Sequence, residues 1–308
     1  MMDIIDAIGK TPFVELKKLS PKGIRIFAKL EGQNVGGSGS VKDRIAKYMI
    51  KKAEEEGKLK EGSTIIEATS GNTGIALAMI GKRKGYRVKI VIPDNASRER
   101  IELLRLYGAE VIFTEGEKGV NHAIEVARKI AENEGYFMPD QFSNPYNPLA
   151  HYETTGKEIL DELGDIKVDA LICGLGTGGT IMGVGKRLRE AFPDMLIIGV
   201  EPYPGDPIPG LRNLDEGFIP SILDLGFITR RVYVSSRESY SSLKELLDKE
   251  GIFAGLSSGA VIHEALKLAL EMGEGNIVVI LPDGGWKYLS LGIEIWTKGR
   301  PRRVEEGP

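Results

Sequence analysis

Cysteine and histidine are almost absent from this 308-residue sequence. Cys173 is the one cysteine, so no disulfide can form within the chain, and the three histidines lack the spacing of a metal site. Lysine and arginine number 41 against 44 acidic residues, so no excess of positive charge is available to bind nucleic acid. No apolar run is long enough to cross a bilayer, and Met1–Lys10 does not have the pattern of a signal peptide. We therefore expect a cytoplasmic protein that needs no metal and binds neither nucleic acid nor membrane.

From residue 60 onward, short β-branched runs alternate with longer amphipathic runs. The runs predict strands at 64–69, 87–92 and 110–114 and helices at 75–84, 98–107 and 120–133. A Pro/Asn cluster at 144–148 is expected to break regular structure. A second series of strands follows it, at 170–174, 196–201 and 276–281, with helices between them. Alternation of this kind is typical of parallel βαβ units.

The two series predict an α/β fold with two lobes, each a twisted, mostly parallel sheet flanked by helices. We expect the smaller lobe to span residues 38–145 and the larger lobe to combine 1–37 with 146–308. Ligands of such sheets bind at the carboxyl ends of the strands, which places the site in the cleft between the lobes. The polar tail after Trp296 is expected to be mobile.

A glycine-rich loop at 36–39 leads into a helix that carries Lys42 in its first turn. Ser40 can cap this helix, and Asp43 completes an S-x-x-D capping pattern. The start of a helix is the positive end of its dipole, so the pKa of the Lys42 amine should fall there. A lowered pKa suits a lysine that forms a Schiff base. Taken alone, however, the segment is better explained by a capped surface helix with a solvated lysine.

The segment 69–74 also joins a strand to a helix. Its two glycines let successive backbone N–H groups converge on an anion such as a carboxylate, and its three hydroxyls and the Asn72 amide add donors. An ordinary strand-to-helix connection needs only a cap. On this segment alone the anion site and the ordinary connection are equally supported.

The segment 174–180 follows a predicted strand and fits G-x-G-x-x-G, with Glu201 at the end of the next strand, as a dinucleotide fold requires. The same segment supplies two threonine hydroxyls and clustered N–H groups that can hold a phosphate monoester. The pattern supports phosphate binding and leaves the cofactor open. Two later segments are less informative: 255–260 is explained by a serine N-cap, and 281–290 is a turn by composition.

Together and in this order, the five motifs resemble the cysteine synthase family, the β-replacement branch of the fold type II pyridoxal-phosphate (PLP) enzymes, which are similar to the tryptophan synthase β chain. The segment 8–12 looks like the N-terminal signature of that family, and 40–44 like its lysine motif. The resemblance runs from about residue 5 to 296. It implies that PLP lies in the cleft between the lobes, joined to Lys42 as a Schiff base.

The resemblance assigns the remaining site residues in two groups. It implies that Asn72 contacts the PLP ring oxygen and that Ser257 contacts the ring nitrogen. The residues implied to bind the PLP phosphate are Gly176, Thr177, Gly178, Gly179 and Thr180. It implies that the substrate carboxylate is bound by Thr69, Ser70, Gly71, Asn72, Thr73 and Gln141. No metal ligand is implied.

The chemistry implied is a β-replacement that makes L-cysteine. PLP acts as an electron sink, Lys42 removes the Cα proton, a leaving group departs to give an α-aminoacrylate, and a sulfur nucleophile adds. The segments 211–218 and 283–290 are similar to those of O-phosphoserine-using members, and a guanidinium at Arg212 can bind a phosphate bidentately. O-acetylserine is the other donor. The alternative for Arg212 is an ion pair with Asp215 or Glu216 on a surface loop.

The resemblance leaves the sulfur source and the partners open. Sulfide is one source, and a thiocarboxylated sulfur-carrier protein is another. A homodimer is the family expectation, and some relatives bind the tail of a serine acetyltransferase. Other functions also remain: a condensation of serine with homocysteine, as in cystathionine β-synthase, a serine or threonine dehydratase, and an NAD-dependent oxidoreductase that uses 174–179. His151 and His263 are interpreted as structural, and Cys173 as a small core residue.

Overall fold

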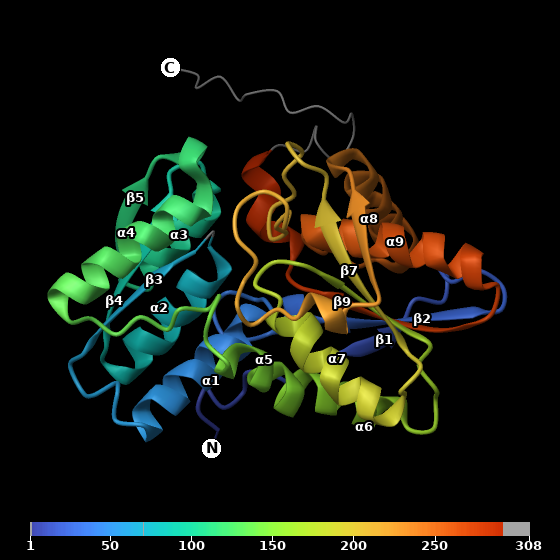
Figure 1. The fold of residues 1–308 in the computed structure, drawn as a ribbon, viewed down its shortest axis with the longest axis horizontal. Coiled ribbons are helices and arrows are strands. Elements are labelled where there is room, and N and C mark those ends of the chain that lie inside the picture. Colours follow the sequence, from blue (N-terminus) through green and yellow to red (C-terminus); the bar gives the residue numbers. More distant parts are fainter. Residues whose placement is uncertain (1, 70, 292–308) are drawn as a thin grey trace.

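A computed structural model describes residues 2–69 and 71–291. Ser70 and the tail after Trp296, two of the positions discussed above, therefore lie outside the described residues. The described chain forms two separate β-sheets with helices packed around each (Figure 1). Within this part of the chain, no helix has the length and apolar character needed to cross a membrane.

The smaller sheet has three parallel strands in the order β3-β4-β5. They are β3 (Thr64–Ala68), β4 (Arg87–Pro93) and β5 (Glu110–Thr114), connected by α2 (Asn72–Lys84) and α3 (Arg98–Leu106) and followed by α4 (Gly119–Glu134). Side chains of β3 alternate between two apolar clusters: Ile65 packs with α2, and Ile66 packs with α4. The strand is buried on both faces, which explains its unbroken apolar sequence.

The larger sheet has the order β1-β2-β9-β6-β7-β8, antiparallel between β1 and β2 and parallel elsewhere. Its strands are β1 (Phe13–Glu15), β2 (Ile24–Leu30), β6 (Ala170–Gly174), β7 (Leu196–Pro202), β8 (Arg230–Val234) and β9 (Gly275–Leu281). One face packs on α8 (Ser236–Glu250) and α9 (Leu256–Met272), and the other on α6 (Gly156–Leu163) and α7 (Gly179–Ala191). Alternate residues of β9 enter the two clusters, so this strand forms the centre of the core.

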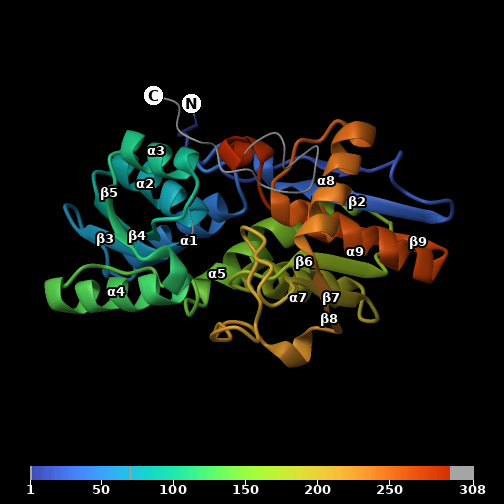
Figure 2. The same cartoon turned by 90° about the horizontal axis from the view of Figure 1, so that it is seen from above.

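Helix α1 (Lys42–Glu55) connects the two sheets in space as well as in sequence (Figure 2). Ala46 and Ile50 pack with α2 of the smaller sheet, whereas Ile45 and Met49 pack with α5 (Tyr146–Ala150). A π-helical turn, η3 (His151–Thr155), joins α5 to α6. The helix that carries the predicted Schiff-base lysine is therefore held from both sides.

The predicted α/β fold class is confirmed, and the expected strands after residue 60 match β3–β7 and β9 to within one residue. The strands β1, β2 and β8 were not predicted from the sequence. The expectation that 144–148 breaks regular structure is wrong, because Pro145 is the N-cap of α5 and Pro148 lies in its first turn, where the missing N–H costs nothing. The division at residues 37 and 146 stays a prediction, although β3, β4 and β5 all lie between those positions.

Candidate active site

A cavity of about 620 Å³ opens where the carboxyl ends of both sheets meet. Gly174 at the end of β6, Pro202 at the end of β7 and Pro93 at the end of β4 all line it. This is where ligands of parallel α/β sheets bind. Most of the predicted site residues line the same cavity: Lys42, Thr69, Asn72, Thr73, Gln141, Gly176, Thr177, Gly178, Thr180, Arg212 and Ser257. Gly71 and Gly179 lie beside it in the chain but not in its wall.

Lys42 is the first residue of α1. The expected Ser40 cap is wrong, because the N-cap is Val41 and no side chain caps the helix. Ser40 and Asp43 nevertheless form hydrogen bonds around the start of the helix. The Ser40 hydroxyl accepts a hydrogen bond from the Lys42 N–H at 3.1 Å, while the Asp43 carboxylate accepts from the Ser40 N–H at 3.0 Å. The side chain is partly buried in the cavity wall, so the alternative of a solvated surface lysine is wrong. Burial lowers the pKa of Lys42 to about 8, against the opposing charge of Asp283. Burial is thus the main cause of the lowered pKa of Lys42, whereas the sequence suggested the helix dipole as the cause.

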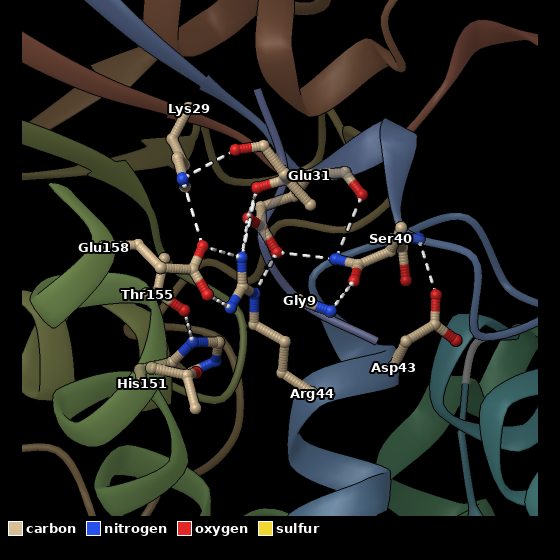
Figure 3. A network of polar contacts seen from close by, with 12 residues as sticks. Gly9, Lys29, Glu31, Ser40, Asp43, Arg44, His151, Thr155 and Glu158 are labelled. Atoms are coloured by element: carbon tan, nitrogen blue, oxygen red, sulfur yellow. Dashed lines mark hydrogen bonds and ion pairs between the residues drawn. The ribbon is translucent and has the colours of Figure 1, made fainter. Parts of the chain in front are cut away.

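A buried charge network fixes α1 to the larger sheet (Figure 3). Arg44 donates to Glu31 through Nε at 2.7 Å and to Glu158 of α6 through Nη1 at 2.6 Å. Lys29 of β2 lies 3.0 Å from the same Glu158. The side chains of Arg44 and Glu31 are 1% and 0% exposed, so the network is largely sealed from water. It sets the position of Lys42 two residues earlier on the helix.

The predicted carboxylate loop is held by a short chain of hydrogen bonds. Thr73 donates to Gln141 Oε1 at 2.7 Å, and Gln141 Nε2 donates to the Ala68 carbonyl at 3.1 Å. Gly71 has φ +143°, and a Cβ on it would lie 2.3 Å from the Arg100 side chain, so this position favours glycine. Glu67 was missed by the sequence analysis. It accepts from the Gln141 N–H at 3.3 Å, and burial, aided by the charge of Asp140, raises its pKa to about 8.

The predicted phosphate loop ends at the start of α7. Gly178, the N-cap, has φ +85°, a left-handed conformation that glycine adopts without strain. Thr177 Oγ1 accepts from Asn147 Nδ2 at 3.1 Å, and the same amide nitrogen donates to the Gln141 carbonyl at 2.7 Å. Asn147 therefore links the phosphate loop to the carboxylate loop. No pattern in the sequence indicates this role, because Asn147 falls in the segment that was expected to break regular structure.

His151 supports the same loop from η3. Its Nδ1 lies 2.9 Å from Thr155 Oγ1 and its Nε2 lies 3.3 Å from Thr180 Oγ1. Burial, together with the charges of Lys42 and Arg44, holds the pKa of His151 well below its usual value. The ring is thus neutral and can exchange hydrogen bonds with both hydroxyls. The structural interpretation of His151 holds, but the residue touches the site.

Two segments that seemed ordinary in sequence also belong to the site. The N-cap of α9 is Gly255 and no side chain caps the helix, so the serine-cap explanation is wrong. Ser257 is buried in the first turn and lines the cavity. The expected turn at 281–290 is largely a 3₁₀ helix, η5 (Gly285–Leu291). Its Lys287 and Tyr288 are buried, and the preceding Asp283 accepts a hydrogen bond from Asn72 Nδ2 at 2.9 Å.

Arg212 lies in the cavity wall with its guanidinium between two aromatic rings. Its Cζ is 5.0 Å from the centroid of Phe142 and 4.4 Å from that of Phe218. Nη1 donates to Asn121 at 3.0 Å, and Nη2 is buried without a hydrogen-bond partner among the described residues. Burial lowers the pKa of Arg212. The alternative ion pairs are wrong, because Asp215 bonds Arg231 and Tyr233, and Glu216 accepts from the Gly205 N–H.

Comparison with known proteins identifies the family. The family model "Pyridoxal-phosphate dependent enzyme" matches residues 4–283. The chain belongs to the pyridoxal-phosphate-dependent enzymes. It is 43% identical over 300 residues to a cysteine synthase of Staphylococcus aureus (94% of this chain, 96% of the relative). It is 42% identical over 294 residues to cysteine synthase B of Escherichia coli K12 (95% and 96%).

Two solved structures share the fold over nearly the whole chain. An O-ureido-L-serine synthase aligns with a TM-score of 0.90 and 38% identity, covering 100% of this chain and 97% of that one. A hydrogen sulfide-producing enzyme from Fusobacterium nucleatum aligns with a TM-score of 0.86 and 42% identity, covering 94% and 100%. The cofactor of the family, PLP, is thus the cofactor of this chain.

The cavity has the features that PLP requires. It contains an amine with a lowered pKa, a glycine-rich helix start with threonine hydroxyls, and a buried acceptor, Asn72 Oδ1, that has no partner among the described residues. The NAD-dependent alternative is wrong. The family is a PLP family, and the Glu201 carboxylate, which would bind a ribose, instead bonds Arg231 at 2.6 Å and the Leu214 N–H at 2.7 Å.

Proposed function

We propose that this enzyme makes L-cysteine by β-replacement on an activated serine, with O-phosphoserine as the preferred donor. The cysteine synthases among its relatives support the product. The observation that carries the donor is the buried, unpartnered Nη2 of Arg212 in the cavity wall. A guanidinium in that state gains most from an anion, and a phosphate ester supplies one where a neutral acetyl ester does not.

One group of the site residues is proposed to bind the cofactor, and another group to bind the substrate carboxylate. Lys42 would hold PLP covalently through its amine, Asn72 would contact the ring oxygen and Ser257 the ring nitrogen, and the phosphate would be bound by Gly176, Thr177, Gly178, Gly179 and Thr180. The substrate carboxylate is bound by Thr69, Ser70, Gly71, Asn72, Thr73 and Gln141. Most of these assignments rest on a shared position around one cavity and on the hydrogen bonds that connect the loops. The assignments of Ser70, Gly71 and Gly179 rest on the family resemblance alone.

The order of chemical events follows from where the basic and cationic groups lie. PLP supplies the electron sink for the charge that develops at the substrate Cα. When the substrate amino group takes its place on the cofactor, Lys42 is released as a free amine, and this amine removes the Cα proton, which its lowered pKa allows near neutrality. Arg212 holds the phosphate as the bond to Cβ breaks. The hydroxyl of Ser257 is too weak an acid to protonate a ring nitrogen beside it, so PLP held there would be a weaker electron sink than beside a carboxylic acid.

Sulfide is the sulfur donor we propose, with a thiocarboxylated carrier protein as the second candidate. The Fusobacterium nucleatum structure of the same fold is that of a hydrogen sulfide-producing enzyme, which supports sulfide as a reactant of this chain. A homodimer, and binding of a serine acetyltransferase tail, stay proposals drawn from the family.

Steady-state cysteine formation tests the proposal. The purified enzyme is given sulfide with O-phosphoserine, O-acetylserine or serine, and, in a separate assay, serine with homocysteine. We expect kcat/KM for O-phosphoserine to exceed that for O-acetylserine by roughly 10-fold or more, because one charged hydrogen bond is worth about 1.5–3 kcal/mol. Equal values would refute the donor preference. Product only from serine and homocysteine would show a cystathionine-forming enzyme.

A second measurement tests Lys42 alone. Borohydride reduction of the purified enzyme, followed by peptide mass spectrometry, should find the pyridoxyl group on the peptide that contains Lys42. Modification of another lysine, such as Lys287, would overturn the assignment whatever the donor.

A further inference from the structure

Asp283 lies just after β9 in the wall of the cavity, and none of the roles proposed above uses it. Its side chain is 1% exposed. Oδ2 accepts hydrogen bonds from Asn72 Nδ2 at 2.9 Å and from the Tyr288 hydroxyl at 2.8 Å, and Lys287 Nζ lies 3.3 Å away. Oδ1 is buried without a hydrogen-bond partner among the described residues. A carboxylate in such surroundings acts strongly on nearby charge, because the protein screens it poorly.

The backbone around Asp283 connects two other parts of the site. The Pro282 carbonyl accepts from the Val41 N–H at 2.8 Å, directly before Lys42. The Asp283 carbonyl accepts from the Gly255 N–H at 2.8 Å, two residues before Ser257. A Cβ on Gly255 would lie 1.9 Å from Asp283 Oδ1, so this glycine makes room for the carboxylate. The carboxylate is therefore fixed relative to both the lysine and the ring-nitrogen residue.

The partners of Asp283 extend to the smaller sheet and to the loop before α1. Arg100 of α3 donates to the Tyr288 hydroxyl at 2.9 Å, and its aliphatic stem packs on Gly71 of the carboxylate loop. Lys287 donates to the Ser38 carbonyl at 2.7 Å. The Tyr288 hydroxyl and the Lys287 amine thus both point at one carboxylate oxygen of Asp283, which fixes the position of that side chain.

We propose that Asp283 is a positioning residue: it orients the Asn72 amide toward the cofactor, and its charge favours the protonated Lys42 amine once that amine has taken the Cα proton. Burial lowers the pKa of Lys42, and Asp283 is the group whose charge raises it again. The first part follows from the direct hydrogen bond to Asn72. The inference rests on the proposed roles of Lys42 and Asn72.

Other charges near this pair must be separated from the effect of Asp283. The charged or titratable groups that act on Lys42, on Asp283 or on their immediate partners are Asp43 of α1, Arg100 of α3, His151 of η3, and Lys287 and Tyr288 of η5. Asp283→Asn changes one charge and keeps the size and an acceptor oxygen. Tyr288→Phe changes a hydrogen bond to the same carboxylate and leaves its charge.

The first test measures the pKa of the Lys42 amine in the full-length chain freed of PLP. The protein is labelled with limiting acetic anhydride across a pH series, and the labelled Lys42 peptide is quantified by mass spectrometry. We expect half-maximal reactivity near pH 8 in the wild type, at lower pH in Asp283→Asn, and at the wild-type pH or above in Tyr288→Phe. No shift in Asp283→Asn, or the same downward shift in both variants, would overturn the electrostatic role. The labelling result does not depend on the donor or on any catalytic step. A failure of this inference can therefore be distinguished from a failure of the proposed function.

The second test concerns Asn72. Asp283→Asn keeps an oxygen that accepts from Asn72, whereas Asp283→Ala removes it. We therefore expect the dissociation constant of PLP to rise roughly 10- to 100-fold in Asp283→Ala, as on loss of an outer hydrogen-bond partner. In Asp283→Asn it should stay near the wild-type value. Equal loss from both variants, or none from either, contradicts the orienting role. If Asp283→Ala does not fold, the labelling experiment with Asp283→Asn still decides the electrostatic claim.

Discussion

Lys42 is a partly buried amine at the first position of α1, with its pKa lowered to about 8. Burial makes the charged form costly, and that cost is present in the folded protein only. The residue serves the proposed chemistry because its neutral form is available near neutral pH. The same property makes the PLP-free protein less stable than its packing alone would allow.

We expect Lys42→Met to raise the free energy of unfolding of the PLP-free protein. Below about pH 8 both folded and unfolded wild-type chains bind the proton, so the cost is fully present. Between 8 and the usual 10.5, only the unfolded chain binds it, so the stability of the wild type rises and the gain from the substitution disappears. Urea unfolding at pH 7 should show a gain on the order of 1–3 kcal/mol. The exposed Lys51→Met is the control, and a loss of stability in Lys42→Met would contradict the argument.

Helix α7 carries the phosphate loop, and its glycines let it approach α5 and η3 closely. A Cβ on Gly183 would lie 2.2 Å from the Pro148 carbonyl and 2.6 Å from the His151 Cβ. His151 in turn contacts Thr180, one turn earlier on α7. The spacing between these helices therefore sets the geometry of the phosphate loop.

Gly183→Ala should lower the free energy of unfolding by about 1–3 kcal/mol, because the helices must move apart to admit the methyl group. It should also weaken PLP retention, measured by the absorbance that remains after dialysis. Gly226→Ala is the control, since its Cβ would meet only a flexible Asp224 side chain at 3.2 Å. Wild-type stability and PLP retention in Gly183→Ala would show that a methyl group fits between α7 and its neighbours without moving the helices apart.

The elements that sequence alone predicted are those with regular patterns. β3, β4 and α2 follow an alternation of buried strand and helix, and the glycine loops follow those strands, so their meeting at one edge was predictable. Asn147, His151 and Asp283 were not predictable, since their partners lie in distant segments such as Thr177, Thr180 and Asn72. The burial of Lys42 was not predictable for the same reason, because the walls of the cavity around it are built by segments far away in the sequence.

At the scale of the whole molecule, the two sheets are connected through α1 and its charge network. Arg44 bonds Glu31, which follows β2, and Glu158 of α6. Burial alone would raise the pKa of Glu158, but Arg44 and Lys29 bring it down to about 2. Glu158 keeps Lys29 as a second partner, whereas Arg44 is the cation paired with the buried Glu31. Loss of Arg44 therefore leaves a buried acidic group without its ion-pair partner.

Arg44→Met should therefore cost about 3–5 kcal/mol in the free energy of unfolding, the range for breaking a buried ion pair from one side. Arg25→Met is the matched control, because Arg25 pairs with Glu15 at a position 46% exposed and should cost less than about 1 kcal/mol. Guanidinium unfolding followed by tryptophan fluorescence compares them. Similar small losses in both variants would mean that the network does not hold α1 in place.

The preference for O-phosphoserine depends on one guanidinium, so the decisive variant is Arg212→Ala. Arg230→Ala, which breaks an exposed pair with Glu271, serves as the control. The measurement is kcat/KM for O-phosphoserine and for O-acetylserine, each with sulfide, in wild type and both variants. We predict a loss of roughly 10- to 100-fold for O-phosphoserine and little change for O-acetylserine in Arg212→Ala, with wild-type values for the control. An equal loss with both donors, or no loss with either, would show that Arg212 does not recognise the phosphate.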